Sequence, residues 1–148
     1  MPNKVLEVKQ IGLVHSPFKT KEEAPIYTYR STFTGKVELF DDYAEGLKDI
    51  EQFSHIILVY YFHKIGRELL TVKAYLDDKD HGVYATRHPH RPNHIGISTV
   101  RLLGRDKNIL TVEGIDIVDG SPLLDIKPYV SAFDKRDSTK DGWLEGKI

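Results

Sequence analysis

The segment from Arg87 to Ser98 holds the densest set of chemically capable side chains in the sequence. Its twelve residues include two arginines, three histidines, two prolines, an asparagine and a glycine. Such a segment packs poorly into a hydrophobic core, whereas functional groups often lie on loops that a rigid scaffold holds in place. We therefore expect this segment to contribute to a site.

The three histidines of this segment first suggest a metal site. His88 and His90 would share one face of a strand, and His94 could supply a third ligand. Pro89 and Pro92 interrupt strand geometry, however, and the segment holds no carboxylate to complete a ligand shell. The sequence therefore disfavours a metal and leaves a histidine-ligated metal hydrolase as an alternative.

Nucleophilic hydrolysis is a weaker alternative. A catalytic serine needs a histidine base and a carboxylate that orients it, and geometry rather than sequence order defines this arrangement. No serine of the chain lies in a Gly-x-Ser-x-Gly turn. The residues available for such a triad are Ser16, Ser54 or Ser98 with His55 and Asp125.

A third interpretation is a site for a small ligand together with a phosphate-bearing partner. Arg87 and Arg91 can each bind a phosphate or a carboxylate through two parallel hydrogen bonds. Asn93 offers both a donor and an acceptor, as recognition of a base edge requires. Asp125 and Lys127 would share one face of a strand, where they could hold a zwitterion or form an exposed ion pair.

The charge of the chain is nearly balanced but unevenly distributed. The formal net charge is -1, so bulk charge does not favour a polyanion. Between residues 87 and 107, Asp106 is the only acid against Arg87, Arg91, Arg101, Arg105 and Lys107. This local basic face could bind phosphate groups, or its side chains could simply be solvated.

Seven segments have the alternating or continuously apolar pattern of β-strands. They are Val5–Val14, Thr34–Phe40, Ser54–Phe62, Leu69–Leu76, Gly96–Leu103, Ile109–Val118 and Leu123–Val130. The third of these is apolar enough to be buried on both faces of a sheet. Gly12 indicates a bulge or a close backbone approach in the first.

Three connecting segments carry further signals. Asp41–Leu47 is expected to be a short helix capped by Asp41 or Asp42. Residues 77 to 82 are expected to form a turn. The connection from 19 to 30 is long, and its Tyr27 and Tyr29 could stack on a nucleobase or cover the edge of the core.

Many short strands and little helix predict an all-β protein, mainly antiparallel, folded as a barrel or a sandwich. The sequence lacks the alternating βα pattern and the Gly-x-Gly-x-x-Gly turn of doubly wound nucleotide-binding folds. A nucleotide-like ligand would therefore bind at the mouth or the edge of the barrel.

The composition is that of one globular domain. Of the 148 residues, 40% are hydrophobic and 29% are charged. We expect a single domain over 1–148, with a core at roughly 8–131 and a tail at 132–148 whose Trp143 docks on the body or on a second subunit. The absence of cysteine excludes disulfides, thiolate catalysis and cysteine-bound zinc. No apolar run reaches the ~20 residues that span a bilayer. The lack of cysteine fits a cytoplasmic protein, which is the location we expect.

Five blocks of residues follow the order of a known family. They are Ile11–Phe18, then Gly46-Leu47 with Phe53–His55, then Phe62-His63, then Ala85–Arg87 with Arg91–Ser98, and finally Asp119–Tyr129. Through these blocks the chain resembles the TsaA-like family, whose characterised members are the TrmO-type tRNA adenine-N6 methyltransferases. A single block is a weak signal, whereas five in order are specific.

The resemblance implies a fold, a cofactor and a substrate. The fold would be a single-sheeted β-barrel-like domain with short helices, assembled as a homodimer, and the methyl donor would be S-adenosyl-L-methionine. The acceptor would be N6 of threonylcarbamoyladenosine at position 37, next to the anticodon of threonine tRNA. The alternative function is a non-enzymatic sensor module that binds S-adenosylmethionine or another nucleotide.

Residue roles follow from the resemblance for the cofactor site, and from the chemistry of the side chains for the RNA side and for the base. The cofactor site would be formed by Ser16, Pro17, Phe18, His63, Lys64, Arg87, Ile97, Leu124, Asp125, Ile126 and Lys127. Stacking and phosphate contacts to an RNA loop are assigned to His88, His90, Arg91 and Asn93. An amine with a delocalised lone pair gains from a base as its proton leaves, and the candidates are Asp125, His63 and Tyr129.

The chain departs from the family pattern at two places. It ends soon after the shared core, whereas many bacterial members continue into a further C-terminal domain. Residues 24–31 also lack the Arg-Gln-Pro-Gly-like stretch of many relatives. Both departures concern the RNA side of the site more than the cofactor side.

Overall fold

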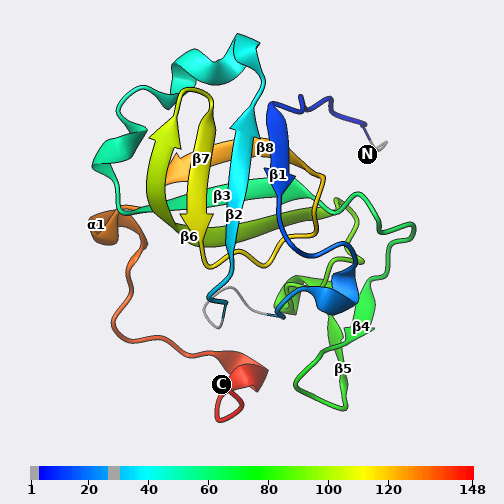
Figure 1. Cartoon of the computed structure of the whole chain (residues 1–148). Helices are drawn as coiled ribbons and strands as arrows, with labels where there is room; N and C mark the ends of the chain where they lie inside the picture. The colour runs from blue at the N-terminus through cyan, green and yellow to red at the C-terminus, as the bar shows by residue number, and fades with distance from the viewer. Residues whose placement is uncertain (1–3, 27–30) are drawn as a thin grey trace.

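Six strands form a closed antiparallel barrel, which is the body of the molecule (Figure 1). The structure is a computed structural model that describes residues 4–26 and 31–148. The barrel strands are β1 (Gly12–His15), β2 (Thr34–Leu39), β3 (His55–Tyr61), β6 (Ile95–Asp106), β7 (Ile109–Glu113) and β8 (Ser121–Pro128). Their order is β1-β2-β7-β6-β3-β8, and every neighbouring pair is antiparallel. The expected all-β, mainly antiparallel barrel is confirmed.

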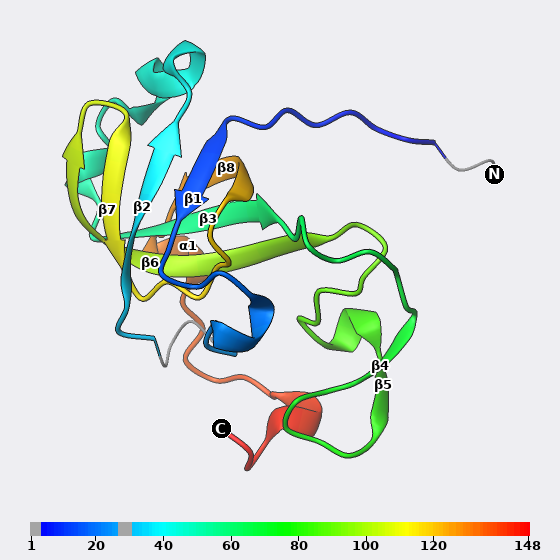
Figure 2. The same cartoon turned by 45° about the vertical axis from the view of Figure 1, so that its right-hand side comes forward.

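A small two-stranded sheet lies beside one end of the barrel, as Figure 2 shows. In it β4 (Thr71–Lys73) pairs antiparallel with β5 (Asp80–Gly82). The predicted turn over 77–82 is therefore wrong for its last three residues, and the strand predicted over 69–76 is shorter than expected. Pairing with β4, whose Val72 is buried, makes a strand of residues that have weak β-propensity themselves.

Short helical segments lie between the strands and in the C-terminal tail. The 3-10 helices are Lys21–Glu23, Asp41–Leu47, Ile50–Gln52, Val83–Ala85 and Gly142–Leu144, and the α-helical turn α1 is Ser131–Asp134. The predicted helix over 41–47 is confirmed as a 3-10 helix, but its N-cap is Phe40 rather than an aspartate. Within the described ranges, no helix has the length and apolar character that crossing a membrane requires.

Two strand boundaries differ from the prediction, and a glycine lies at each. Residues 5–11 are extended but lie outside any strand, and β1 begins at Gly12. A Cβ atom on Gly12 would overlap the carbonyl oxygen of Glu38, so the close approach expected at this glycine is confirmed. At the other boundary, β7 ends at Glu113 because Gly114 has a φ of 93°, which turns the chain out of the sheet.

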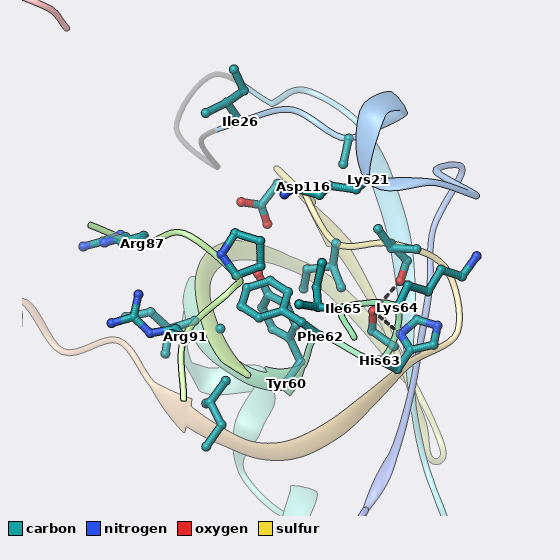
Figure 3. Close-up of a pocket in the computed structure, with 18 of the residues that line it drawn as sticks. Lys21, Ile26, Tyr60, Phe62, His63, Lys64, Ile65, Arg87, Arg91 and Asp116 are labelled. Atoms are coloured by element: carbon teal, nitrogen blue, oxygen red, sulfur yellow. Dashed lines mark hydrogen bonds between the residues drawn. The ribbon is translucent and has the colours of Figure 1, made fainter. Parts of the chain in front are cut away.

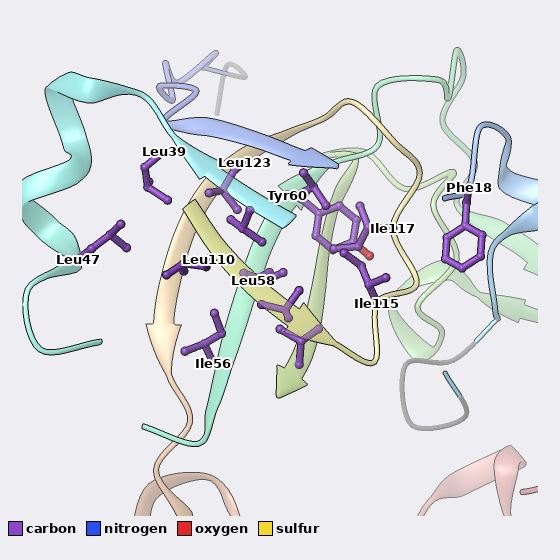
Figure 4. Close-up of a cluster of buried hydrophobic side chains, with 14 residues drawn as sticks. Phe18, Leu39, Leu47, Ile56, Leu58, Tyr60, Leu110, Ile115, Ile117 and Leu123 are labelled. Carbon is purple, nitrogen blue, oxygen red and sulfur yellow. The ribbon is translucent and has the colours of Figure 1, made fainter. Parts of the chain in front are cut away.

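Alternate residues of each strand fill the barrel (Figure 4). On β3, Ile56, Leu58 and Tyr60 are buried, while the residues between them are only half-buried. The expected burial of this strand on both faces is wrong, because one face of a barrel strand points inward and the other points out. The buried cluster contains Val14, Phe18, Val37, Leu39, Leu47, Ile56, Leu58, Tyr60, Val100, Leu110, Val112, Ile115, Ile117 and Leu123.

The C-terminal tail returns to the small sheet. The Trp143 indole stacks on the imidazole of His81 at 4.6 Å, and its N–H donates to the carbonyl oxygen of Ala85 at 2.8 Å. The Asp77 carboxylate binds His81 at 2.7 Å and Lys147 at 3.1 Å. The expectation that Trp143 docks the tail on the body is confirmed.

Candidate active site

A cavity of about 620 Å³ opens at the end of the barrel where β3 ends and β6 begins (Figure 3). Residues from four segments line it: 21–26, 60–65, 86–97 and 116–121, with Tyr75 from the segment after β4. The cavity therefore lies where the barrel meets the small sheet. Its volume is in the range of pockets that take small ligands and cofactors.

The floor of the cavity is aromatic. The rings of Tyr60 and Phe62 meet edge to face, with centroids 5.3 Å apart and an interplanar angle of 79°. Gly96 pairs with Tyr60 across the two strands, and a Cβ atom there would lie 2.7 Å from both rings. The missing side chain of Gly96 is what allows the two rings to pack at this position.

Three polar groups connect the barrel interior with the cavity wall. Ser98 on β6 is only 2% exposed, and its Oγ lies 2.6 Å from Asp116 Oδ1 and 3.2 Å from the Tyr60 hydroxyl. A serine hydroxyl has one proton, so all three groups are satisfied when Tyr60 donates to Ser98 and Ser98 donates to Asp116. Burial and then the Asp116 charge raise the pKa of Tyr60 well above its usual range, which keeps the phenol a donor.

Hydrogen bonds from the segment after β1 hold the 116–121 wall in place. The Ser16 N–H donates to Asp119 Oδ1 at 2.9 Å, and the Ser16 hydroxyl donates to the Ile117 carbonyl at 2.5 Å. The Lys19 ammonium binds Asp119 Oδ2 at 2.7 Å and holds the pKa of that carboxyl below its usual value. Ser16, a predicted cofactor residue, thus lies behind the cavity wall and braces it.

The next two predicted cofactor residues also lie outside the cavity lining. Phe18 is buried in the core against Phe33, with centroids 4.9 Å apart, and its carbonyl accepts the Asp119 N–H at 2.7 Å. Pro17 borders a shallow neighbouring depression together with Lys36.

His63 and Lys64, predicted for the cofactor site, do line the cavity. His63 Nδ1 lies 3.4 Å from the Ser121 hydroxyl, and the Lys64 ammonium donates to the Lys19 carbonyl at 2.6 Å. Burial, reinforced by the Lys64 charge, lowers the pKa of His63 from its ordinary value. The neutral form of the imidazole is therefore favoured.

Two arginines of the segment singled out in the sequence reach the cavity. Arg91 donates from Nη1 to the carbonyls of Thr86 and His88, at 2.9 and 3.2 Å, and so fixes the loop before β6. Arg87 is exposed at the rim, as Figure 3 shows, and Ile97 forms another part of the lining with 51% of its surface exposed. This rim combines cationic and apolar groups.

An aromatic group stands beside the cavity mouth. The His88 imidazole stacks on Tyr75 at 5.8 Å and lies 5.2 Å from the His90 ring, while the Lys21 ammonium lies 5.6 Å from the Tyr75 centroid. Burial, and then the nearby Lys21 charge, lowers the pKa of His88 to about 4. Asn93, the fourth residue predicted to contact RNA, is exposed in the turn before β6. Tyr27 and Tyr29 lie outside the described residues.

The remaining predicted site residues, on β8 and just after it, do not line the cavity. They are Leu124, Asp125, Ile126, Lys127 and Tyr129. The Asp125 carboxylate forms an ion pair with Lys127 at 3.0 Å. Tyr129 packs against His55 at the opposite end of β3, which at ~3.3 Å per residue is roughly 20 Å from the cavity end.

The described residues do not assemble the metal site or the catalytic triad that the two alternative functions require. His94 Nδ1 lies 3.0 Å from the Pro89 carbonyl oxygen and its ring packs against Tyr61, whereas the His88 and His90 rings lie 5.2 Å from each other. The described part of the chain holds no group of three or more histidines and carboxylates placed to bind a metal. Ser54 does bond to His55 at 2.8 Å, but the carboxylate of the proposed triad is paired with a lysine on β8.

The basic stretch between 87 and 107 divides between two ends of the barrel. Arg87 and Arg91 lie at the cavity. Arg101 is 3.8 Å from Glu113, and Arg105 is 2.9 Å from Glu51. The single basic face that the sequence suggested is therefore absent as a continuous surface among these residues.

Asp116, Tyr75 and Lys21 are cavity residues that the sequence did not single out. Asp116 fell inside a strand predicted to run to Val118. Gly114 is the one signal that could have ended that strand earlier and moved Asp116 into a loop. Tyr75 and Lys21 come from segments far apart in sequence, so only the fold brings them together.

The chain is similar in sequence to a known family and to proteins within it. A sequence model of the tRNA-methyltransferase O N-terminal domain matches residues 13–135. Over 141 residues the chain is 52% identical to a Pyrococcus abyssi protein named "Probable S-adenosyl-L-methionine-binding protein", covering 95% of this chain and 77% of that protein. Over 137 residues it is 34% identical to the human tRNA (adenine(37)-N6)-methyltransferase, covering 87% of this chain and 31% of the human protein.

Solved structures show the same fold. A crystal structure of TrmO matches with a TM-score of 0.80 and 37% identity, over 94% of this chain and 64% of that one. TrmO from Pseudomonas aeruginosa matches with a TM-score of 0.79 and 36% identity, over 95% and 63%. The chain thus spans less than two thirds of the solved chains and about a third of the human protein.

Proposed function

The chain belongs to the tRNA-methyltransferase O N-terminal domain family, and we propose that it is an S-adenosyl-L-methionine-dependent tRNA methyltransferase. The observation that carries this proposal is the 620 Å³ cavity at the barrel mouth, whose floor is aromatic and whose rim is cationic. An adenosine and a carboxylate-bearing methionine chain need these two kinds of surface. The relatives named as S-adenosylmethionine-binding proteins and as a tRNA methyltransferase support it.

The residues around the cavity fit the methyl donor. Lys64 and Arg87 present cationic groups for a carboxylate, and Ile97 with the aromatic floor presents apolar surface. Ser16 acts on the cofactor through the 116–121 wall that it braces. The cofactor, when bound, supplies an activated methyl group, and the protein holds the donor and acceptor in line and excludes water.

We assign the acceptor to N6 of the modified adenosine at position 37 of tRNA. Support comes from the family and from the group of Tyr75, His88, His90 and Lys21 beside the cavity mouth. Stacked rings and cations are the surface that an unstacked loop base and its phosphates require. We further propose that this adenosine carries a threonylcarbamoyl group and that the substrate is threonine tRNA. We place the reaction in the cytoplasm.

A homodimer is part of the proposal. Tyr61, Ile95 and Ile97 lie on paired strands with 39%, 39% and 51% of their surfaces exposed, next to the cavity. An apolar row at the rim of a site suits a second copy of the chain. Across that contact, residues such as Asp125, Lys127 and Tyr129 could serve the partner's cavity. The molar mass by light scattering tests this: a monomer at all concentrations contradicts it.

Two measurements test the proposed function. Calorimetry with S-adenosylmethionine should give stoichiometric binding, and no binding at millimolar ligand contradicts the cofactor. Methyl transfer should then occur to tRNA that carries threonylcarbamoyladenosine and be much slower to the same tRNA without it. Binding without transfer to any tRNA would favour the sensor module instead.

A further inference from the structure

The proposed reaction, on which this inference rests, needs a proton acceptor. The lone pair of N6 in threonylcarbamoyladenosine is delocalised into the purine and the carbamoyl group. Such a nitrogen attacks a methyl group efficiently only if its proton is taken up as the new bond forms. A general base must therefore reach N6 from the wall of the cavity.

Few groups of the described cavity lining can accept a proton at neutral pH. The carboxylates are Glu22 and Asp116, and the imidazole is His63. Glu22 is exposed on a short 3-10 helix, and no hydrogen bond or ion pair among the described residues fixes the direction of its carboxylate. His63 lies beside Ser121 and the Gly120 turn, on the side of the cavity where the braced wall would hold the cofactor.

Asp116 differs from these two groups in how it is held. Its carboxylate points into the cavity over the aromatic floor (Figure 3), and its Oδ1 accepts the short bond from Ser98. Ser98 is in turn supported by the Tyr60 hydroxyl. Two hydroxyls anchored in the barrel interior thus fix the orientation of this carboxylate, as a base that must meet one nitrogen requires.

Ser98 is buried on the inward-facing side of β6. Its neighbours two residues away on β6 are Gly96 and Val100, and all three side-chain positions face the interior. A buried hydroxyl must find a partner, so an alanine or a valine would be the simpler residue for the core alone. Among the described residues, the hydrogen-bond partners of this hydroxyl are Asp116 and Tyr60.

We propose that Asp116 is the general base that accepts the N6 proton, and that Ser98 and Tyr60 are positioning residues that aim it. In the transfer the N6–CH3 bond forms and the S–CH3 bond breaks, with its electron pair passing to sulfur. The N6 proton passes to the Asp116 carboxylate. The positive charge of the sulfonium and the negative charge of the carboxylate are both lost in this step. The products are a neutral thioether, a neutral methylated base and a protonated Asp116.

The test compares Asp116→Asn with the wild-type chain and with Asp106→Asn. Asp106 is an exposed aspartate at the far end of β6, so it is a matched control for the loss of one carboxylate. Single-turnover methyl transfer is measured with saturating S-adenosylmethionine and modified tRNA, and the affinity for each ligand is measured by calorimetry. Asp116→Asn should lower the rate about 10²- to 10³-fold and leave both affinities within about threefold, because a general base contributes on that scale.

Each other outcome overturns a defined part of the proposal. An undiminished rate in Asp116→Asn, with an active wild type, rejects the base while the proposed function stands. A large loss of S-adenosylmethionine affinity with an intact rate at saturation makes Asp116 a cofactor ligand instead. An inactive wild type rejects the proposed function itself, and with it the role of Asp116.

The positioning role has a readout that does not depend on turnover. Ser98→Ala removes a donor to the charged form of Asp116, so the pKa of Asp116, followed by carbon NMR of labelled aspartate, should rise relative to the wild type. The acid limb of the pH–rate profile should move to higher pH with it, and the rate should fall about tenfold. An unchanged Asp116 titration in a folded Ser98→Ala protein contradicts the positioning role.

Discussion

Gly96 and Tyr60 face each other across β6 and β3 at the mouth of the barrel, so closely that a Cβ atom on Gly96 would lie 2.7 Å from the tyrosine ring. The same Cβ atom would also lie 2.7 Å from the Phe62 ring. The aromatic floor of the cavity therefore depends on a residue that has no side chain at all.

Replacing Gly96 by alanine should damage both the fold and the site. The added methyl group must displace two packed rings, and overpacking of this kind costs about 1–3 kcal/mol of the free energy of unfolding. Cofactor affinity should fall as well, because the floor moves. Gly104→Ala on the same strand is the control, since a Cβ there meets nothing within 4 Å. Equal stability of the two variants by denaturant titration would contradict this account.

Arg87→Ala should weaken cofactor binding more than it weakens folding. Arg87 is exposed at the cavity rim, and exposed substitutions change stability by about 0.5 kcal/mol or less. A hydrogen bond to a charged ligand group is worth about 1.5–3 kcal/mol, so the Kd for S-adenosylmethionine should rise roughly 10- to 100-fold. Arg101→Ala, at the other end of the barrel, should leave the Kd unchanged. A destabilised Arg87→Ala with wild-type affinity would show a structural role.

The barrel was accessible to prediction because its signal is local. Period-two alternation, turn residues and the apolar run of β3 each depend on neighbours in sequence. β5 was missed since its residues become a strand only by pairing with β4, and the end of β7 depended on one glycine.

The residues of the site could be predicted only in part from the sequence. His63, Arg87 and Arg91 lie in motif blocks, Lys64 directly follows one, and all four line the cavity. Asp116 carries no local signature, because its partner Ser98 lies 18 residues away in the chain, and the Tyr60 hydroxyl that supports Ser98 comes from yet another strand. The roles proposed for Asp125 and Tyr129 remain predictions, since both lie outside this cavity and only a second subunit could bring them to one.

The pH dependence of stability should carry a contribution from His88. Its pKa in the folded protein is lowered to about 4, first by burial and then by Lys21, against an ordinary value of 6.5. Between pH 4 and pH 6.5 the unfolded chain binds more protons at His88 than the folded chain does. The contribution of His88 to the free energy of unfolding is therefore fully present above pH 6.5 and declines as the pH falls toward 4. His88→Gln should reduce that decline. NMR titration of His88 near pH 6.5 would contradict the assignment.

Ser16→Ala should loosen the 116–121 wall. The variant loses the hydroxyl bond to the Ile117 carbonyl, a contribution of about 0.5–1.5 kcal/mol, while the backbone bond to Asp119 remains. We expect a modest loss of stability and a several-fold rise in the Kd for S-adenosylmethionine. Ser54→Ala, which removes an exposed hydroxyl at the opposite end of β3, is the control. If the two variants bind S-adenosylmethionine with the same Kd, the Ser16 hydroxyl does not influence the cofactor site.

The proposed methyl transfer can be followed by nucleoside mass spectrometry of tRNA after incubation with the protein and methyl-labelled S-adenosylmethionine. We expect labelled methyl on N6 of threonylcarbamoyladenosine at position 37, with little label when that modification is absent. No labelled nucleoside, or equal labelling of tRNA with and without the threonylcarbamoyl group, would contradict it.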